Sequence, residues 1–279
     1  MTLNLDERQR AMLCEMHVPV WWPKPSAPAA LSSAQAAEAQ PSVAPQVHAP
    51  RAPPAKGARQ GQSVLPATLT NASTLNWPAL QQAVATCQAC PLCEGRNKTV
   101  FGVGPAAPDV QRPPQADWLI VGEAPGENED RTGEPFVGQA GQLLDNMLKA
   151  MGVSRTDNVY IVNVIKCRPP GNRNPEAAEI VQCEPYLRRQ IELLQPKVIL
   201  AMGRYAANSL LKMSVPDVHK MPLGKLRGQV YHYANAGTQV PVIATYHPAY
   251  LLRNLPEKAG SWADLCLAMQ VMKQRQLQA

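Results

Sequence analysis

The sequence predicts an α/β fold in which helices cover both faces of a mainly parallel sheet. Five short apolar runs have the character of strands, at 117–122, 159–165, 197–202, 229–233 and 242–245. Helical patterns with an apolar stripe cover 138–152, 175–194, 203–213 and 261–275. Because strand and helix alternate along most of the chain, successive strands are expected to run parallel, with the connecting helices packed on both faces.

Local signals support the individual elements. A first helix is expected at 78–86, where Leu80 and Val84 stand four residues apart. The helix after the first strand has a continuous apolar stripe, formed by Leu143, Leu144, Met147, Leu148 and Met151. Pro175 stands in the first turn of the next helix, which is a favoured place for proline, and Pro196 ends that helix.

Composition limits the class of protein. The chain has 279 residues and a formal net charge of +6, a mild surplus that is compatible with a polyanionic partner without establishing one. No apolar stretch approaches the roughly 20 residues that cross a bilayer, so a membrane protein is not expected. The N-terminus has acidic residues where a secretory signal would be basic, so a cytoplasmic protein is expected. Nothing in the sequence indicates an obligate dimer, and a monomer is expected.

The chain is expected to divide into an extension and a folded domain. Residues 2–16 could form a short amphipathic helix, and residues 19–66 are rich in proline and alanine with little aliphatic periodicity. Such a composition cannot bury enough apolar surface to offset chain entropy, so a disordered linker is expected there. The predicted division is an N-terminal extension over 1–75 and a folded domain over 76–279.

The cysteines indicate a metal centre. An odd count of seven in a chain of this length argues against a disulfide framework. Cys87 and Cys90 are separated by two residues, a spacing that lets both thiolates reach one centre, and Cys167 and Cys183 could complete a set of four. The spread-out pattern is unlike a zinc ribbon and favours a [4Fe–4S] cluster, although zinc remains open. Cys93 could be a bystander or could replace one of the four.

The loops after the parallel strands hold the unusual residues, at 123–138, 166–174 and 246–254. Ligands of such sheets bind beyond the carboxyl ends of the strands. The first loop is acidic and lacks the glycine spacing of a phosphate loop, so nucleotide binding of that kind is not expected. Its carboxylates, Glu123 and Glu129 among them, suit water activation or the stabilisation of a developing cation, with solvated helix-capping acids as the alternative.

Two side chains could recognise a flat polar ligand. Phe136, in a glycine-rich loop, could stack on such a ligand or anchor the core. Asn163 lies inside an apolar strand, where a buried amide is costly unless its hydrogen bonds are satisfied. Its donor and acceptor match the O4 and N3–H edge of uracil or a similar base, and a structural amide is the competing interpretation.

Cations and leucines on the other two loops suggest contacts with nucleic acid. Lys166, Arg168 and Arg173 surround a rigid turn that would suit phosphate contacts, or they form a merely solvated loop. His247, fixed by the following proline, could donate a hydrogen bond to an oxyanion. The pattern Leu251-Leu252-Arg253 could place an apolar wedge beside a cation, although single leucines on loops usually serve packing.

Five segments together carry a resemblance to a known family. They are Cys87-x-x-Cys90, Gly122-Glu123-Ala124-Pro125-Gly126-Glu127-x-Glu129-Asp130, Pro135-Phe136-Val137-Gly138, Asn163-Val164-Ile165-Lys166-Cys167-Arg168-Pro169-Pro170 and His247-Pro248-Ala249-Tyr250-Leu251-Leu252-Arg253. In this order they resemble the type 4 uracil-DNA glycosylases, the iron–sulfur branch of the uracil-DNA glycosylase superfamily. The resemblance covers roughly the last 190 residues, and residues 1–75 lie outside it.

The resemblance implies a three-layer α/β/α sandwich with a short, mainly parallel central sheet. It also implies a structural [4Fe–4S] cluster, with the ligand set Cys87, Cys90, Cys167 and Cys183. Cys93 stands where the family commonly has a residue that is not a ligand, which leaves the ligand set open at this point.

The implied activity is base excision repair of uracil-containing DNA, in which deoxyuridine is flipped out and its N-glycosidic bond hydrolysed. Phe136 would stack on uracil, Asn163 would read its polar edge, and His247 would stabilise the anion that develops on uracil O2. Ala124 stands where the superfamily often has the acid that activates water, so this role is expected to pass to Glu123 or, failing that, Glu129.

The resemblance also completes the expected contacts. The uracil-binding set would comprise Glu123, Ala124, Phe136, Asn163 and His247, and the DNA-binding set would comprise Lys166, Arg168, Arg173, Leu251, Leu252 and Arg253. Two rival hypotheses remain: a catalytically silent iron–sulfur module that binds nucleic acid, and a zinc-stapled α/β hydrolase acting on a small polar substrate.

Overall fold

The computed structural model describes residues 72–107, 112–235 and 238–277 of the chain. The helix expected at 2–16 and the linker expected at 19–66 lie outside these residues. Among the described residues, no helix combines the length and the apolar character that would let it span a membrane.

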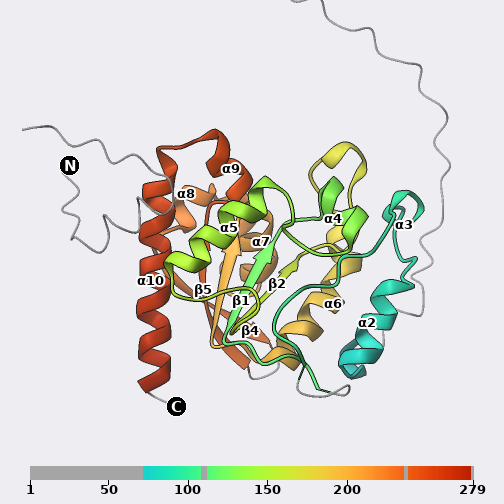
Figure 1. Cartoon of the computed structure of the whole chain (residues 1–279), viewed down its shortest axis with the longest axis horizontal. Helices are drawn as coiled ribbons and strands as arrows, with labels where there is room; N and C mark the ends of the chain where they lie inside the picture. The colour runs from blue at the N-terminus through green and yellow to red at the C-terminus, as the bar shows by residue number, and fades with distance from the viewer. Residues whose placement is uncertain (1–71, 108–111, 236–237, 278–279) are drawn as a thin grey trace, which may run out of the picture. The chain divides into compact units, whose positions relative to one another are not determined.

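A five-stranded sheet forms the centre of the fold, in the order β2-β1-β3-β5-β4 (Figure 1). The strands are β1 (Trp118–Gly122), β2 (Val159–Asn163), β3 (Val198–Met202), β4 (Val230–Asn235) and β5 (Thr238–Thr245). The first four strands in this order pair in parallel, and β4 at the edge pairs antiparallel with β5. The predicted mainly parallel sheet is therefore confirmed.

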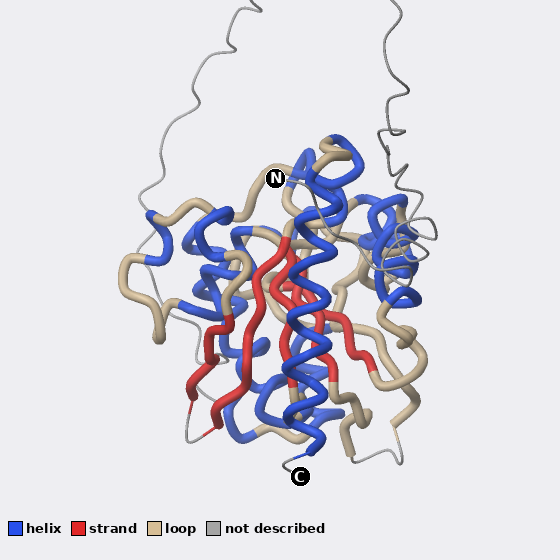
Figure 2. Tube along the Cα trace, turned by 90° about the vertical axis from the view of Figure 1, so that its left-hand side faces the viewer, coloured by secondary structure: helices blue, strands red, loops and turns tan. Residues whose placement is uncertain are grey.

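Helices cover the sheet on both faces, as the alternating pattern predicts. One face packs against α2 (Trp77–Ala85), α6 (Ala177–Leu194) and α7 (Arg204–Leu211). The opposite face packs against α5 (Gln139–Ala150), α9 (Pro248–Arg253) and α10 (Glu257–Leu277). Figure 2 shows the long C-terminal helix α10 running in front of the strands. These layers confirm the α/β/α sandwich.

The central strands β1 and β3 are apolar along their whole length because both of their faces are buried. In β1, Leu119 and Val121 belong to the core on the side of α6, whereas Trp118 and Ile120 belong to the core on the side of α5. Side chains alternate between the two faces of a strand, so a strand between two helical layers needs an apolar residue at every position.

Short helices were missed because they contain too few residues to show a helical period. Two of them lie in segments expected to be loops: α4 (Glu127–Thr132) and α9. The others are α3 (Leu92–Gly95), α8 (Leu223–Leu226) and the 3₁₀ turns Ala72–Thr74, Pro170–Asn172 and Val218–Lys220. The last helix also begins four residues earlier than expected, at Glu257.

Candidate functional site

A cavity of about 660 Å³ lies beyond the carboxyl ends of the parallel strands. All three loops that were expected to hold the site contribute to its lining, together with the start of α7. The expected site residues that border it are Glu123, Ala124, Glu129, Phe136, Asn163, Arg173, His247 and Arg253. The structure thus brings together side chains that are separated by up to 130 positions in the sequence.

Asn163 presents an unused acceptor to this cavity. The residue is 2% exposed, and its Oδ1 has no hydrogen-bond partner among the described residues. Gly122 is its partner in the pairing of β1 with β2, and a Cβ at Gly122 would lie 2.3 Å from that oxygen. A buried acceptor without a partner costs free energy unless a ligand satisfies it. The amide is therefore suited to recognition of a ligand.

Phe136 and His247 form an aromatic pair at the cavity. Their ring centroids are 5.3 Å apart, with 25° between the ring planes. Phe136 is 5% exposed and also belongs to the core cluster around α5, so it combines a packing role with a place at the cavity. The same hypothetical Cβ at Gly122 would lie 2.7 Å from the Phe136 ring. Only glycine leaves room for the ring and the Asn163 amide together.

His247 is held in a defined neutral form. It is the N-cap residue of α9, and its Nδ1 accepts a hydrogen bond of 3.2 Å from the backbone N–H of Ala249. An Nδ1 that accepts carries no proton, so the proton of the neutral ring lies on Nε2. The pKa of His247 is lowered to about 4, chiefly by burial, with Glu129 opposing the shift and the charge of Arg253 adding to it. The imidazole is therefore a neutral donor at physiological pH.

The two candidate carboxylates have different surroundings. Burial raises the pKa of Glu123 above its ordinary value, and the charge of Arg204 partly offsets that effect. Glu129 is engaged by backbone amides: its Oε2 accepts from the N–H of Gly126 at 3.0 Å, and its Oε1 accepts from the following loop. This arrangement suits a structural role for Glu129. Glu123 is therefore the better candidate for the carboxylate that acts on a substrate or on water.

Asp130 does not fit the alternative interpretation of this acidic loop, in which its carboxylates are solvent-exposed and cap the next helix. It is 1% exposed, and its Oδ1 accepts hydrogen bonds from the backbone N–H groups of Asn97 and Lys98. The carboxylate thus joins α4 to the segment that follows α3. Its role is to fix the first loop against a neighbouring one.

The placement of Lys166 contradicts the predicted phosphate contact. Its side chain is buried, and its Nζ donates hydrogen bonds of 2.7 Å to the backbone carbonyl of Asn163 and to Oε1 of Gln190 on α6. Burial lowers the pKa of Lys166 to about 7. A group enclosed in this way cannot reach a DNA backbone, so its contribution is to the internal structure.

The two arginines of the same loop remain accessible. The guanidinium of Arg168 lies 3.3 Å from the exposed carboxylate of Glu127, and that of Arg173 pairs with Glu179. The pair of Arg168 with the exposed Glu127 is of a kind that contributes little to stability, and Arg168 can exchange this partner for another anion. The carboxylate of Glu179 is buried, so its pair with Arg173 orients the arginine, whose own side chain stays partly exposed. Contact of Arg168 and Arg173 with DNA remains a prediction.

The leucine pair after His247 is divided between the core and the surface. Leu251 is fully buried against the helices on its side of the sheet, which contradicts its predicted role as an exposed wedge. Leu252 is 39% exposed, and Arg253 is exposed beside the cavity. Because α9 is helical, successive side chains point in different directions, so only Leu252 is available as a wedge.

Five cysteines line one small pocket between α2, α3 and α6. They are Cys87, Cys90, Cys93, Cys167 and Cys183. Arg96 donates a hydrogen bond of 3.3 Å to the sulfur of Cys167, and burial raises the pKa of Cys183 to about 12. Cys266 lies on α10 and packs against the other core cluster. The four cysteines expected to bind a metal therefore lie together.

This donor set fits a [4Fe–4S] cluster. Within the described residues, no three His, Cys, Asp or Glu side chains are arranged to hold a single metal ion. The thiolates of a [4Fe–4S] cluster bind four different iron atoms, so they need to surround the pocket without meeting at one point. Five cysteines line this pocket, so it contains enough thiol donors for such a cluster.

Comparison with known protein families decides the identity of the fold. A model of the uracil DNA glycosylase superfamily matches residues 108–267, which is more than half of the chain. The chain belongs to the uracil DNA glycosylase superfamily. In this superfamily member, the matched span includes the cavity and two of the five clustered cysteines, Cys167 and Cys183.

Individual relatives cover more of the chain. The type-4 uracil-DNA glycosylase of Pyrobaculum aerophilum is 44% identical over 188 residues, which are 67% of this chain and 90% of the relative. The enzyme of the same name from Archaeoglobus fulgidus is 43% identical over 169 residues, or 61% and 79%. That from Saccharolobus solfataricus is 42% identical over 182 residues, or 65% and 79%.

One part of the cavity of this superfamily member was not anticipated from the sequence. Tyr246 and Tyr250 border the cavity with their rings stacked, 4.7 Å between centroids and 30° between planes. The guanidinium of Arg227 lies 4.1 Å from the centroid of Tyr246 and pairs with Asp264 on α10. The position of Tyr246 next to His247 in the sequence could have indicated that it borders the cavity. Its contact with Arg227 joins distant segments, so no local sequence pattern indicates it.

Proposed function

We propose that the protein is a uracil-DNA glycosylase that flips deoxyuridine out of DNA and hydrolyses its N-glycosidic bond, releasing uracil and leaving an abasic site. The observation that carries the proposal is the buried Oδ1 of Asn163, which has no hydrogen-bond partner within the part of the chain that the structure describes and lies at the cavity that Phe136 and His247 also border. An enzyme acting on a base within a duplex must extrude it into such a pocket. Relatives named type-4 uracil-DNA glycosylase support the same conclusion.

Recognition of uracil follows from the chemistry of an amide. The Oδ1 of Asn163 would accept the N3–H of uracil, and its Nδ2 would donate to O4. Cytosine has an acceptor at N3 and an amino group at C4, so the same amide would face unpaired groups. A buried site built for one hydrogen-bonding edge rejects the other because the mismatch leaves polar groups unsatisfied. Phe136 would stack on the face of the base and exclude water.

Bond cleavage needs charge stabilisation on both fragments. As the N-glycosidic bond breaks, its electron pair moves to the base and develops negative charge on O2, while positive charge develops on the deoxyribose. The Nε2–H of neutral His247 would donate to O2, and Glu123 would stabilise the cation and orient the water that attacks C1′. The raised pKa of Glu123 suits a group that receives a proton from this water.

The surface around the cavity suits contact with the DNA backbone. Arg168 and Arg173 lie on the loop after β2 and Arg253 lies at the end of α9, and these arginines would contact phosphates. The exposed Leu252 would fill the space that the extruded nucleotide leaves in the duplex. Both contributions would raise affinity for DNA without reading the base.

A [4Fe–4S] cluster would be held by Cys87, Cys90, Cys167 and Cys183. When bound, the cluster would supply a covalent link between three segments of the chain. Those segments are the turn after α2, the loop after β2 and helix α6. The loop after β2 also contributes to the base cavity, so the link would order part of the site. Cys93 lines the same pocket and is the alternative fourth ligand.

Iron and acid-labile sulfide in anaerobically purified protein test the cofactor. The wild type is expected to contain both, with broad visible absorbance, and Cys183→Ser is expected to lose them. Cys266→Ser is the matched control because Cys266 lies on α10 and packs in the other core cluster. Zinc without sulfide in the wild type would overturn the cluster proposal.

Release of uracil from a uracil-containing oligonucleotide tests the activity. Alkali is expected to cleave the strand after incubation with the wild type, and His247→Ala and Asn163→Ala are expected to prevent this. Gln274→Ala changes an exposed residue of α10 and serves as the control. An intact strand with the wild type, together with retained binding to the oligonucleotide, would favour the catalytically silent module.

A further inference from the structure

Phe136 has a backbone conformation that its sequence does not favour. Its φ angle is 56°, in the left-handed region, where side chains with a Cβ are rarely found. Residues kept in such conformations require surroundings that hold them there, and they concentrate at functional sites. Neighbouring residues must therefore hold the backbone of Phe136 in this conformation, and with it the position of the ring.

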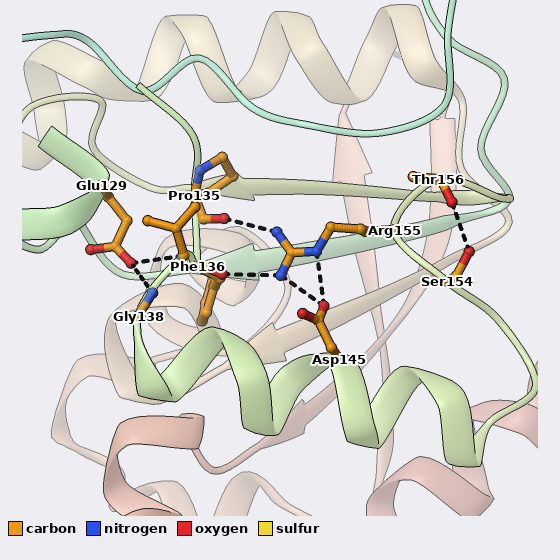
Figure 3. Close-up of polar contacts among 9 residues, drawn as sticks. Glu129, Pro135, Phe136, Gly138, Asp145, Ser154, Arg155 and Thr156 are labelled. Atoms are coloured by element: carbon orange, nitrogen blue, oxygen red, sulfur yellow. Dashed lines mark hydrogen bonds and ion pairs between the residues drawn. The ribbon is translucent and has the colours of Figure 1, made fainter. Parts of the chain in front are cut away.

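Two oppositely charged side chains hold the backbone on either side of Phe136 (Figure 3). Arg155 donates from Nη1 to the carbonyl of Pro135 at 3.2 Å and from Nη2 to the carbonyl of Phe136 at 3.0 Å. Glu129 accepts at Oε1 from the next two backbone amides, of Val137 and Gly138. Consecutive carbonyls thus face a cation and consecutive amides face an anion, which fixes the orientation of the peptide groups on both sides of Phe136.

Arg155 is itself oriented by α5. Its Nε donates to Oδ1 of Asp145 at 2.8 Å, and its Nη2 lies 2.8 Å from the same oxygen. The helix also approaches the loop directly, because a Cβ at Gly141 would lie 1.7 Å from the carbonyl oxygen of Phe136. The guanidinium therefore joins α5 to the loop, and its planar arrangement of donors allows one side chain to hold both carbonyls.

We propose that Arg155, oriented by Asp145, is a positioning residue that sets the Phe136 ring against the extruded base. This inference rests on the proposed uracil-DNA glycosylase function. Arg155 is not among the described residues that border the cavity, so it acts through Phe136 and touches neither base nor sugar. Loss of the fork would release the two carbonyls and let Phe136 leave the left-handed conformation, which moves the ring.

Fluorine NMR tests the positioning directly because the chain has only two phenylalanines, Phe101 and Phe136. Full-length protein labelled with 4-fluorophenylalanine is expected to give two resonances, and Phe136→Leu identifies which one belongs to Phe136. In Arg155→Met, the Phe136 resonance is expected to shift or broaden while that of Phe101 stays unchanged. Arg275→Met, which changes an exposed arginine at the end of α10, is expected to alter neither.

Conservative variants keep the test decisive if Arg155→Met does not fold. Arg155→Lys retains the charge but not the planar fork, and Asp145→Asn weakens the orientation of an intact Arg155. Both are expected to disturb the Phe136 resonance less than Arg155→Met does. A Phe136 resonance that is unchanged in every folded variant would overturn the proposal.

A double-mutant cycle connects the positioning to the reaction. The single-turnover rate of uracil release is expected to fall roughly 10- to 100-fold in Arg155→Met, since a misplacement on the order of 1 Å can cost about 100-fold. In a Phe136→Leu background, Arg155→Met is expected to cause no further fall, because the ring through which it acts is gone. Effects that multiply would indicate a general structural role and overturn the inference.

The two hypotheses fail in different ways. A wild type that releases no uracil would overturn the proposed function, whereas the NMR comparison would still report whether Arg155 fixes Phe136. A wild type that releases uracil, with an Arg155→Met variant that releases it equally fast, would overturn the positioning role alone.

Discussion

The imidazole of His247 and the ring of Phe136 stack with their centroids 5.3 Å apart, although 111 positions separate them in the sequence. Their contact brings the end of β5 against the loop that precedes α5. Each residue then has a defined neighbour: Nδ1 of His247 accepts from Ala249, and the Phe136 carbonyl accepts from Arg155. The pair combines a flat apolar surface with the N–H donor of a neutral imidazole, which are the two features that an extruded pyrimidine requires.

We expect His247 to stay neutral well below the pH at which an ordinary histidine is charged. Its folded pKa of about 4 lies below the ordinary 6.5 because burial disfavours the cation. Between these values the unfolded chain binds more protons, so the contribution of His247 to stability is complete above pH 6.5 and decreases as the pH falls toward 4. Ring-nitrogen NMR, assigned with His247→Gln, measures the titration. A ring that is protonated at pH 6 in the folded chain would contradict this.

We expect the acidic limb of the pH–rate profile to follow Glu123. Burial raises the pKa of this carboxyl above its ordinary 4.5, and only the ionised form can stabilise the cation or accept a proton from water. The single-turnover rate should therefore be constant near neutrality and fall as the pH decreases through the raised pKa of Glu123. The measurement compares the wild type with Glu123→Gln, which should be slower throughout and should lack this limb. Retention of the limb in Glu123→Gln would assign it to another group.

We expect Asn163→Leu to separate activity from stability. The substitution keeps a similar volume and removes a buried acceptor that has no partner among the described residues, so the melting temperature should not fall. Uracil release should fall on the order of 100-fold or more, because the side chain that pairs with the base is gone. Thermal unfolding and single-turnover kinetics on the same preparations measure both effects. A large loss of stability would identify Asn163 as a structural amide instead.

We expect Gly122→Ala to obstruct the base site. The added Cβ would lie 2.3 Å from Oδ1 of Asn163 and 2.7 Å from the Phe136 ring, and both groups would have to move. Overpacking of this kind typically costs about 1–3 kcal/mol, and uracil release should be lost with it. Gly95→Ala is the matched control, because a Cβ at Gly95 meets nothing within 4 Å. Chemical unfolding and uracil release should both distinguish the two variants.

The sequence predicted the site best where a polar residue stands in an apolar segment. Asn163 stands in an otherwise apolar strand, and such an exception can be seen without any structure. The sheet topology brings the ends of parallel strands to one edge, so the three loops could be expected to meet. Contacts between distant segments gave no such signal. Lys166 was expected to be exposed because it follows a strand, whereas its buried ammonium pairs with Gln190 on the distant helix α6, a partner that the sequence does not reveal.

Short helices limited the rest of the prediction. The segment after β5 contains too few residues for a helical period to be recognised, and both of its leucines were therefore assigned to an exposed loop. Once α9 forms, the two side chains point in different directions, and one of them enters the core. The same limit applies to α4, which was expected to be a loop: its Glu129 borders the cavity and also accepts hydrogen bonds from backbone amides that the sequence does not reveal.

We expect the two leucines of α9 to have separable roles. Leu251→Ala should cost about 2–5 kcal/mol of stability, because it leaves a cavity in a fully buried position. Leu252→Ala should leave the unfolding transition nearly unchanged, because its side chain is 39% exposed. If Leu252 fills the gap left by the flipped nucleotide, its variant should release uracil severalfold more slowly from duplex DNA and at the normal rate from a single strand, which has no stacked gap to fill. Chemical unfolding and kinetics on matched duplex and single-stranded oligonucleotides measure these differences. Equal rates for Leu252→Ala and the wild type on the duplex would remove the wedge from the mechanism and leave the exposed arginines as the groups that hold the DNA.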